Sequence, residues 1–112
     1  MKTSRKPEGK IMVLELSGKL MGGPDHEKFK AEIKSLIDEG YKDVILDLAG
    51  VPWVNSTGLG ILISGYHSLR AAEGTMKICE VKERVLSIFY ISQLQNIFTV
   101  FQTRQEALDS YE

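Results

Sequence analysis

The sequence predicts an α/β fold built on a mixed, mostly parallel sheet of four to five strands with about four helices. Short apolar runs alternate with segments of helical periodicity, and glycine or proline marks most of the boundaries between them. The resulting order is β-β-α-β-α-β-α-β-α. Because strands that alternate with helices favour parallel pairing, only the first two strands are expected to pair antiparallel.

The first two predicted strands lie before residue 18. Residues 2–6 form a weak, polar candidate for an edge strand, although the basic side chains of residues 1–10 are also typical of a frayed, solvated start (Lys2, Arg5, Lys6 and Lys10). Pro7-Glu8-Gly9 predicts a turn. Residues 10–17 are apolar enough for a mostly buried strand.

A helix and a central strand follow. Pro24 suits the first turn of a helix, and Gly40 is a good C-terminal stop. The apolar residues between them fall on one helical face (Phe29, Ile33, Leu36 and Ile37). Residues 44–48, a short run of β-branched residues and leucine, predict a central strand.

The second predicted helix is rich in glycine. Its apolar residues are spaced to form one face (Leu59, Leu62, Ile63, Tyr66 and Leu69). Gly58, Gly60 and Gly65 each lower helix propensity by roughly 1 kcal/mol relative to alanine. A helix that keeps three glycines is expected to pack its backbone close to another element.

The remaining elements follow Gly74, which closes the second helix. Strands are predicted at residues 75–81 and 97–101, and a helix at residues 83–91 with an apolar face (Val85, Leu86 and Phe89). Thr103 and Glu106 fit a capping box for a C-terminal helix that carries apolar residues (Ala107, Leu108 and Tyr111).

Composition indicates a single globular domain over residues 1–112, with 43% apolar residues and a net charge of −1. That charge gives no indication of a nucleic-acid or anionic-membrane partner. One cysteine excludes an intramolecular disulfide, and no apolar run is long enough to cross a bilayer. Without a secretory signal pattern, we expect a cytoplasmic protein with no direct membrane insertion.

The sequence contains no pattern for catalysis, a cofactor or a metal. His26 and His67 are expected to be exposed helix residues, and Cys79 a buried, inert thiol. Phosphate-binding and nucleophile-elbow motifs are missing. We therefore predict a protein that is not an enzyme. Trp53 is expected to be a core or loop anchor, or a contact residue for a partner.

The most informative segment runs from Leu46 to Gly60, where an apolar strand leads through a short loop to two adjacent hydroxyl residues. Ser56 and Thr57 fall at a helix N-terminus, where free backbone N–H groups and the helix dipole favour negative charge. A hydroxyl there can cap the helix or carry a phosphate.

This segment resembles the signature of the STAS domain, shared by bacterial anti-sigma factor antagonists and the cytoplasmic ends of sulfate transporters. The resemblance rests on residues 47–60, and it extends to Gly18-Lys19-Leu20-Met21 and to residues 85–97. It implies partner switching. The unmodified protein binds an anti-sigma factor of the serine-kinase type, that kinase phosphorylates Ser56, and a serine/threonine phosphatase reverses the reaction.

The resemblance also implies a set of site residues. Ser56 is the expected phosphorylation site, with Thr57 as the lesser candidate, and partner contacts are expected around them (Met21, Gly22, Trp53, Asn55, Ser56, Thr57, Gly58 and Leu59). Asn55 stands where the family usually has aspartate, and Lys19 and Met21 replace two acidic residues. Two alternatives stay open: a constitutive accessory subunit of a membrane transporter, and a sensor that binds a small anion or nucleotide at the helix N-terminus.

Overall fold

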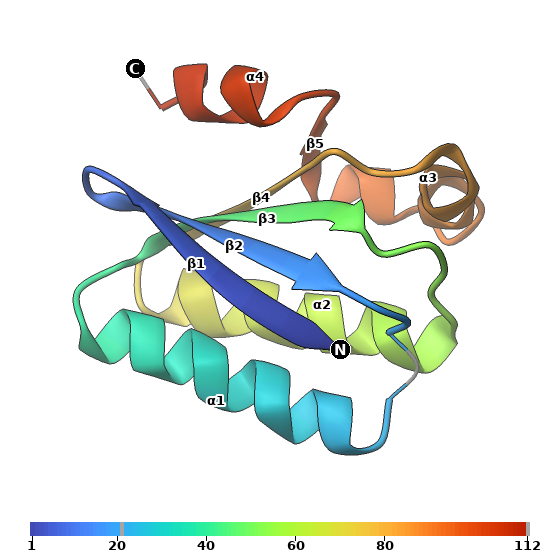
Figure 1. The fold of residues 1–112 in the computed structure, drawn as a ribbon, viewed down its shortest axis with the longest axis horizontal. Coiled ribbons are helices and arrows are strands. Elements are labelled where there is room, and N and C mark those ends of the chain that lie inside the picture. Colours follow the sequence, from blue (N-terminus) through green and yellow to red (C-terminus); the bar gives the residue numbers. More distant parts are fainter. Residues whose placement is uncertain (21, 112) are drawn as a thin grey trace.

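A five-stranded sheet separates two helical layers in the computed structural model, which describes residues 1–20 and 22–111 (Figure 1). The strand order is β1-β2-β3-β4-β5, and only β1 pairs antiparallel with its neighbour, as predicted. The elements are β1 (Lys2–Glu8), β2 (Ile11–Ser17), α1 (Pro24–Asp38), β3 (Asp43–Gly50), α2 (Ser56–Ala71), β4 (Thr75–Cys79), α3 (Glu83–Ile91), a 3-10 turn η1 (Leu94–Asn96), β5 (Thr99–Phe101) and α4 (Arg104–Asp109).

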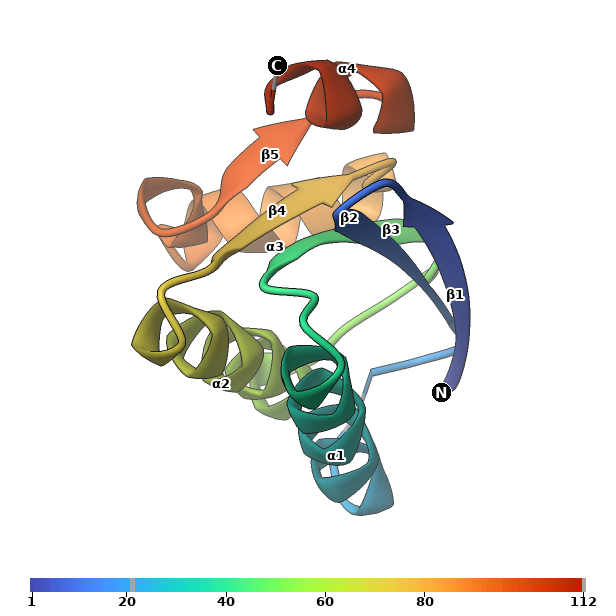
Figure 2. The same cartoon turned by 90° about the vertical axis from the view of Figure 1, so that its left-hand side faces the viewer.

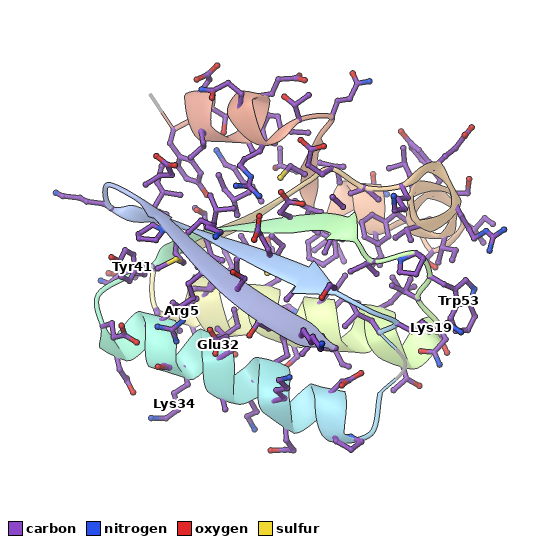
Figure 3. All side chains as sticks on the ribbon, in the orientation of Figure 1. Arg5, Lys19, Glu32, Lys34, Tyr41 and Trp53 are labelled. Atoms are coloured by element: carbon purple, nitrogen blue, oxygen red, sulfur yellow. The ribbon has the colours of Figure 1, made fainter. Side chains whose placement is uncertain are left out.

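The first strand is longer than predicted, and the alternative of a frayed N-terminus is wrong. β1 extends through Pro7 to Glu8, which an edge strand allows because proline's missing N–H faces no partner strand. The Arg5 guanidinium donates to Glu32 Oε1 of α1 (2.6 Å) and to Oε2 of Glu39, the C-cap of that helix (2.8 Å). Figure 3 shows Arg5 and Glu32 between the two elements. These contacts hold β1 against α1.

The main core lies between the sheet and the helices α1 and α2, which run side by side below it (Figure 2). Apolar residues of the three central strands alternate onto this face (Leu14, Leu16, Val44, Leu46, Leu48, Met76 and Ile78). The predicted glycine packing is confirmed at two positions of three. A Cβ on Gly58 would lie 2.0 Å from the Leu20 carbonyl oxygen, and one on Gly65 2.4 Å from the Phe29 ring, whereas Gly60 has open space.

The last two strands differ from prediction at their boundaries. β4 ends at Cys79 rather than at residue 81 because Glu80 has a left-handed backbone (φ 57°). β5 begins at Thr99 rather than at residue 97, since η1 occupies the preceding residues and Phe98 turns into the core. The third helix has the predicted bounds. The N-cap half of the predicted capping box is confirmed, because the Thr103 hydroxyl accepts from the Glu106 N–H (3.1 Å), but the Glu106 carboxylate accepts from that hydroxyl (3.1 Å) rather than from the Thr103 N–H.

A smaller cluster lies on the opposite face of the sheet, under α4. It contains Val13, Ile45, Cys79 and Ala107. As predicted, Cys79 is fully buried. Burial raises the pKa of its thiol from 9.0 to about 12, with a smaller contribution from the negative charge of Asp47.

We expect Cys79 to resist alkylation in the folded protein. Its thiol stays protonated near neutral pH, and the thiolate is the nucleophile. Iodoacetamide labelling followed by mass spectrometry should show slow modification of native protein and fast modification in denaturant. The stability that the neutral thiol contributes is complete below pH 9.0 and declines as the pH rises toward 12. Fast labelling of native protein would contradict the buried assignment.

Candidate functional site

Asn55, not the hydroxyl pair, caps α2. Its side-chain Oδ1 accepts a hydrogen bond from the Gly58 N–H (2.7 Å), and its backbone is extended, as an N-cap requires. Ser56 and Thr57 are the first two residues inside the helix. The interpretation of these hydroxyls as helix caps is therefore wrong, because the preceding amide side chain already fills that position.

Of the two hydroxyl residues, Ser56 has the side chain that is less constrained by packing. Both side chains are exposed, and within residues 1–20 and 22–111 neither forms a hydrogen bond. The Thr57 methyl group, however, lies against the backbone of Gly22, where a Cβ would be 2.3 Å from Thr57 Cγ2. Gly22 also has a left-handed backbone (φ 96°), so this close approach depends on glycine.

Backbone contacts join the loop after β2 to the loop before α2. Leu20 forms a parallel bridge with Val54, its N–H donates to the Trp53 carbonyl (3.4 Å), and its own carbonyl accepts from the Asn55 N–H (3.3 Å). Gly58 lies directly beneath that carbonyl. The position of Ser56 is thus fixed by two loops and a helix rather than by one flexible turn.

The structure brings most of the predicted contact residues to one end of the molecule. We define the α2 N-terminal face as Lys19, Trp53, Asn55, Ser56 and Thr57, all of which are exposed or half-buried. Figure 3 shows Lys19 and Trp53 at this end, beside the start of α2. Other predicted contact residues are buried behind it (Gly22, Gly58 and Leu59). Met21 lies outside the described residues.

The charge of this face suits an anion. The first turn of α2 has no acidic side chain, and the positive end of the helix dipole lies there. Lys19 adds an exposed cation in the adjoining loop. The local potential at Ser56 is therefore favourable to a negative charge.

A cluster of charges that was not predicted lies on the other face of the sheet. Arg104, the first residue of α4, donates from Nε and Nη2 to Asp47 Oδ2 (3.0 and 2.6 Å) and from Nη2 to Glu15. Asp47 is only 5% exposed. These bonds raise the pKa of the guanidinium above its usual value, Asp47 contributing more than Glu15. One sequence signal could have indicated this cluster: a single acidic residue interrupts each of two apolar strands, Glu15 in β2 and Asp47 in β3.

No metal site or membrane span occurs in the described part of the chain. No three residues among its His, Cys, Asp and Glu side chains come together to hold a metal ion, and none of its helices is long and apolar enough to cross a bilayer. His67 is exposed, as predicted, whereas His26 is half-buried.

Comparison with known proteins gives one family match and several named relatives. The profile of the STAS domain matches residues 3–107. The BtrV protein of Bordetella bronchiseptica, described as a candidate anti-sigma factor antagonist, is 31% identical over 77% of this chain and 74% of its own. The anti-sigma F factor antagonist of Paenibacillus polymyxa is 24% identical, over 91% of this chain and 87% of its own.

Solved structures share the fold at low sequence identity. A candidate anti-sigma factor antagonist of Thermotoga maritima has a TM-score of 0.87 at 20% identity, covering 96% of this chain and 92% of its own. The phosphorylated form of SpoIIAA from Bacillus has a TM-score of 0.73 at 20% identity, covering 99% and 100%. A sulfate transporter family protein of Wolinella succinogenes has a TM-score of 0.79 at 20% identity, covering 90% and 84%.

Proposed function

Because the chain belongs to the STAS domain family, we propose that it is a regulatory protein, not an enzyme, that acts as an anti-sigma factor antagonist. Its partner is an anti-sigma factor of the serine-kinase type, which docks on the α2 N-terminal face. The kinase phosphorylates Ser56, phosphorylation releases the partner, and a serine/threonine phosphatase restores the binding form. The names of the relatives support the general role.

The observation that carries the proposal is the position of Ser56. Its side chain is exposed at the first turn of α2, while Asn55 already performs the capping that would otherwise account for a hydroxyl there. Thr57 is exposed too, but its methyl group packs on Gly22. Of the two hydroxyls, Ser56 is therefore the one that a kinase reaches with less disturbance of the fold.

The chemistry of phosphate explains how one modification acts as a switch. A phosphate adds about −1.5 to −2 charge, and a nearby helix N-terminus stabilises an anion by roughly 0.3–1 kcal/mol. Inside a partner interface the same group must lose water and face the partner's own charges. Changing a complex from almost fully bound to almost fully free takes roughly 5.5 kcal/mol of differential affinity. The fold tolerates the phosphate and the interface does not.

A phosphorylation assay tests the assignment of the site. We expect the full chain, incubated with ATP and a serine-kinase anti-sigma factor from its host, to gain the mass of one phosphate. The Thr57→Ala variant should be modified like the wild type, because its Ser56 is intact. The Ser56→Ala variant should stay unmodified. Modification of Ser56→Ala but not of Thr57→Ala would overturn the assignment.

A second candidate function is a constitutive accessory role in a membrane transporter. One observation favours it: an exposed lysine, Lys19, and the amide of Asn55 occupy positions where acidic residues are expected for a phosphorylated member. This role requires no phosphate on Ser56. Co-purification with a permease, together with unmodified intact mass in native cells, would favour it over partner switching.

A further inference from the structure

A cavity with several charged and hydroxyl side chains in its lining lies on the α4 side of the sheet, on the opposite face from α2. Its volume is about 460 Å³, within the range of small-molecule sites. It lies beside α4, which packs mainly on β3, β4 and β5 and does not cover the part of the sheet that the start of β1 and the end of β2 form (Figure 2). The polar residues that line it come from four elements (Lys2, Ser4, Glu15, Ser17, Asp47 and Arg104).

The sheet register turns the cavity's polar side chains to the same face. Lys2 pairs with Ser17, and Ser4 pairs with Glu15, so these four side chains project together. Among the described residues, the ammonium of Lys2 and the hydroxyls of Ser4 and Ser17 have no hydrogen-bond partner. Three groups able to donate hydrogen bonds are therefore available to a ligand.

Arg104 adds further donors in a fixed position. Its Nε and Nη2 are held by Asp47 and Glu15, and the side chain is 32% exposed. Its Nη1 has no partner among the described residues, which leaves two N–H groups free. Because two carboxylates fix the guanidinium plane, little side-chain entropy is lost when Nη1 binds a ligand.

The acidic side chains limit the charge of the ligand. The Asp47 carboxylate is largely engaged, because Oδ2 accepts from Arg104 and Oδ1 accepts from the Ala49 N–H (2.9 Å). Glu15 uses Oε2 for Arg104, and its Oε1 has no partner among the described residues. Two cations and two carboxylates make the lining neutral overall. It therefore suits one anionic group beside Lys2 and Arg104, together with a donor for Glu15.

We propose that this cavity binds a small carboxylate that also carries a hydrogen-bond donor, such as a hydroxy acid or an amino acid. The carboxylate lies between the Lys2 ammonium and Arg104 Nη1, and the ligand's hydroxyl or ammonium donates to Glu15 Oε1. The hydroxyls of Ser4 and Ser17, which also line the cavity, complete the contacts. This site is independent of the role proposed for Ser56, from which the sheet separates it.

A nuclear magnetic resonance titration of the full chain with L-lactate and L-serine tests the proposal. We expect saturable shifts of backbone amides at residues 2–4 and 49–50. The Lys2→Met variant should bind about tenfold more weakly, the loss of one charge-assisted hydrogen bond. Lys6→Met is the matched control, because Lys6 lies on the same face of β1 outside the cavity lining, and its affinity should not change.

Three results of this titration would overturn the proposal. Absence of saturable shifts with both probes would do so, as would equal affinity in the Lys2→Met variant. Tighter binding of inorganic phosphate would indicate a simple cationic patch instead, since Glu15 should repel a dianion. Well-dispersed spectra of the Lys2→Met and Lys6→Met variants would confirm that both are folded. Phosphorylation of Ser56 is measured in a separate assay, so a failure of either proposal leaves the other intact.

Discussion

Replacing Gly58 with alanine is expected to destabilise the protein by about 3 kcal/mol or more, the upper range for overpacking. The new Cβ would lie 2.0 Å from the Leu20 carbonyl oxygen, so the backbone of the neighbouring loop has to move. Gly60→Ala is the matched control, because the same methyl group there meets open space and should stabilise the helix by about 1 kcal/mol. Urea unfolding of the two variants measures the difference.

The Gly58→Ala variant also tests how the docking face is held. The Leu20 carbonyl accepts from the Asn55 N–H (3.3 Å), and moving it should weaken the bridge between Leu20 and Val54. Partner affinity should therefore fall in Gly58→Ala and stay unchanged in Gly60→Ala. Equal stability of the two variants would contradict the close packing of the loop on α2.

Loss of the Arg104 side chain is the second large effect. Arg104→Ala leaves the carboxylate of Asp47 buried without its cation, which costs about 3 kcal/mol by comparison with other broken buried pairs. α4 should detach first, because its buried apolar contact is small and the guanidinium joins it to the sheet. Hydrogen exchange of α4 amides and urea unfolding measure the two consequences.

A double variant separates the charge effect from the lost packing. Arg104→Met with Asp47→Leu removes both charges and keeps apolar volume, so it should recover most of the stability lost in Arg104→Ala. If the double variant is as unstable as the single one, the ion pair is not what holds α4. Lys34→Ala is a control for an exposed pair with Asp38 and should change stability by less than about 0.5 kcal/mol.

Local sequence signals predicted most of the fold. The apolar spacing of α1 placed Phe29, Ile33 and Leu36 in the core, where all three are buried. The bounds of α3 and the N-cap at Thr103 were also correct, because propensity, periodicity and capping are properties of neighbouring residues. The error in β4 follows from the left-handed backbone of Glu80, and the error in β5 from the 3-10 turn η1 that precedes it, and no local sequence signal indicated either feature.

The sequence indicated which segment forms the α2 N-terminal face but not the contacts that hold it. The sequence located Ser56 at a helix N-terminus, yet assigned capping to the hydroxyl pair rather than to Asn55. It also did not indicate which buried residues support the face, because the contact of Gly58 with Leu20 joins segments distant in the chain. Arg104 is separated in the sequence from Asp47 by 57 positions and from Glu15 by 89, so no local pattern could indicate that these three residues come together.

The most direct test of partner switching compares the affinity of unmodified and Ser56-phosphorylated protein for the same anti-sigma factor, by calorimetry. We expect the phosphate to weaken binding by at least about 100-fold, or roughly 2.8 kcal/mol, with no loss of fold stability. Ser56→Ala should bind like the unmodified protein. Equal affinities of the phosphorylated and unmodified forms would contradict the role of Ser56 as a switch.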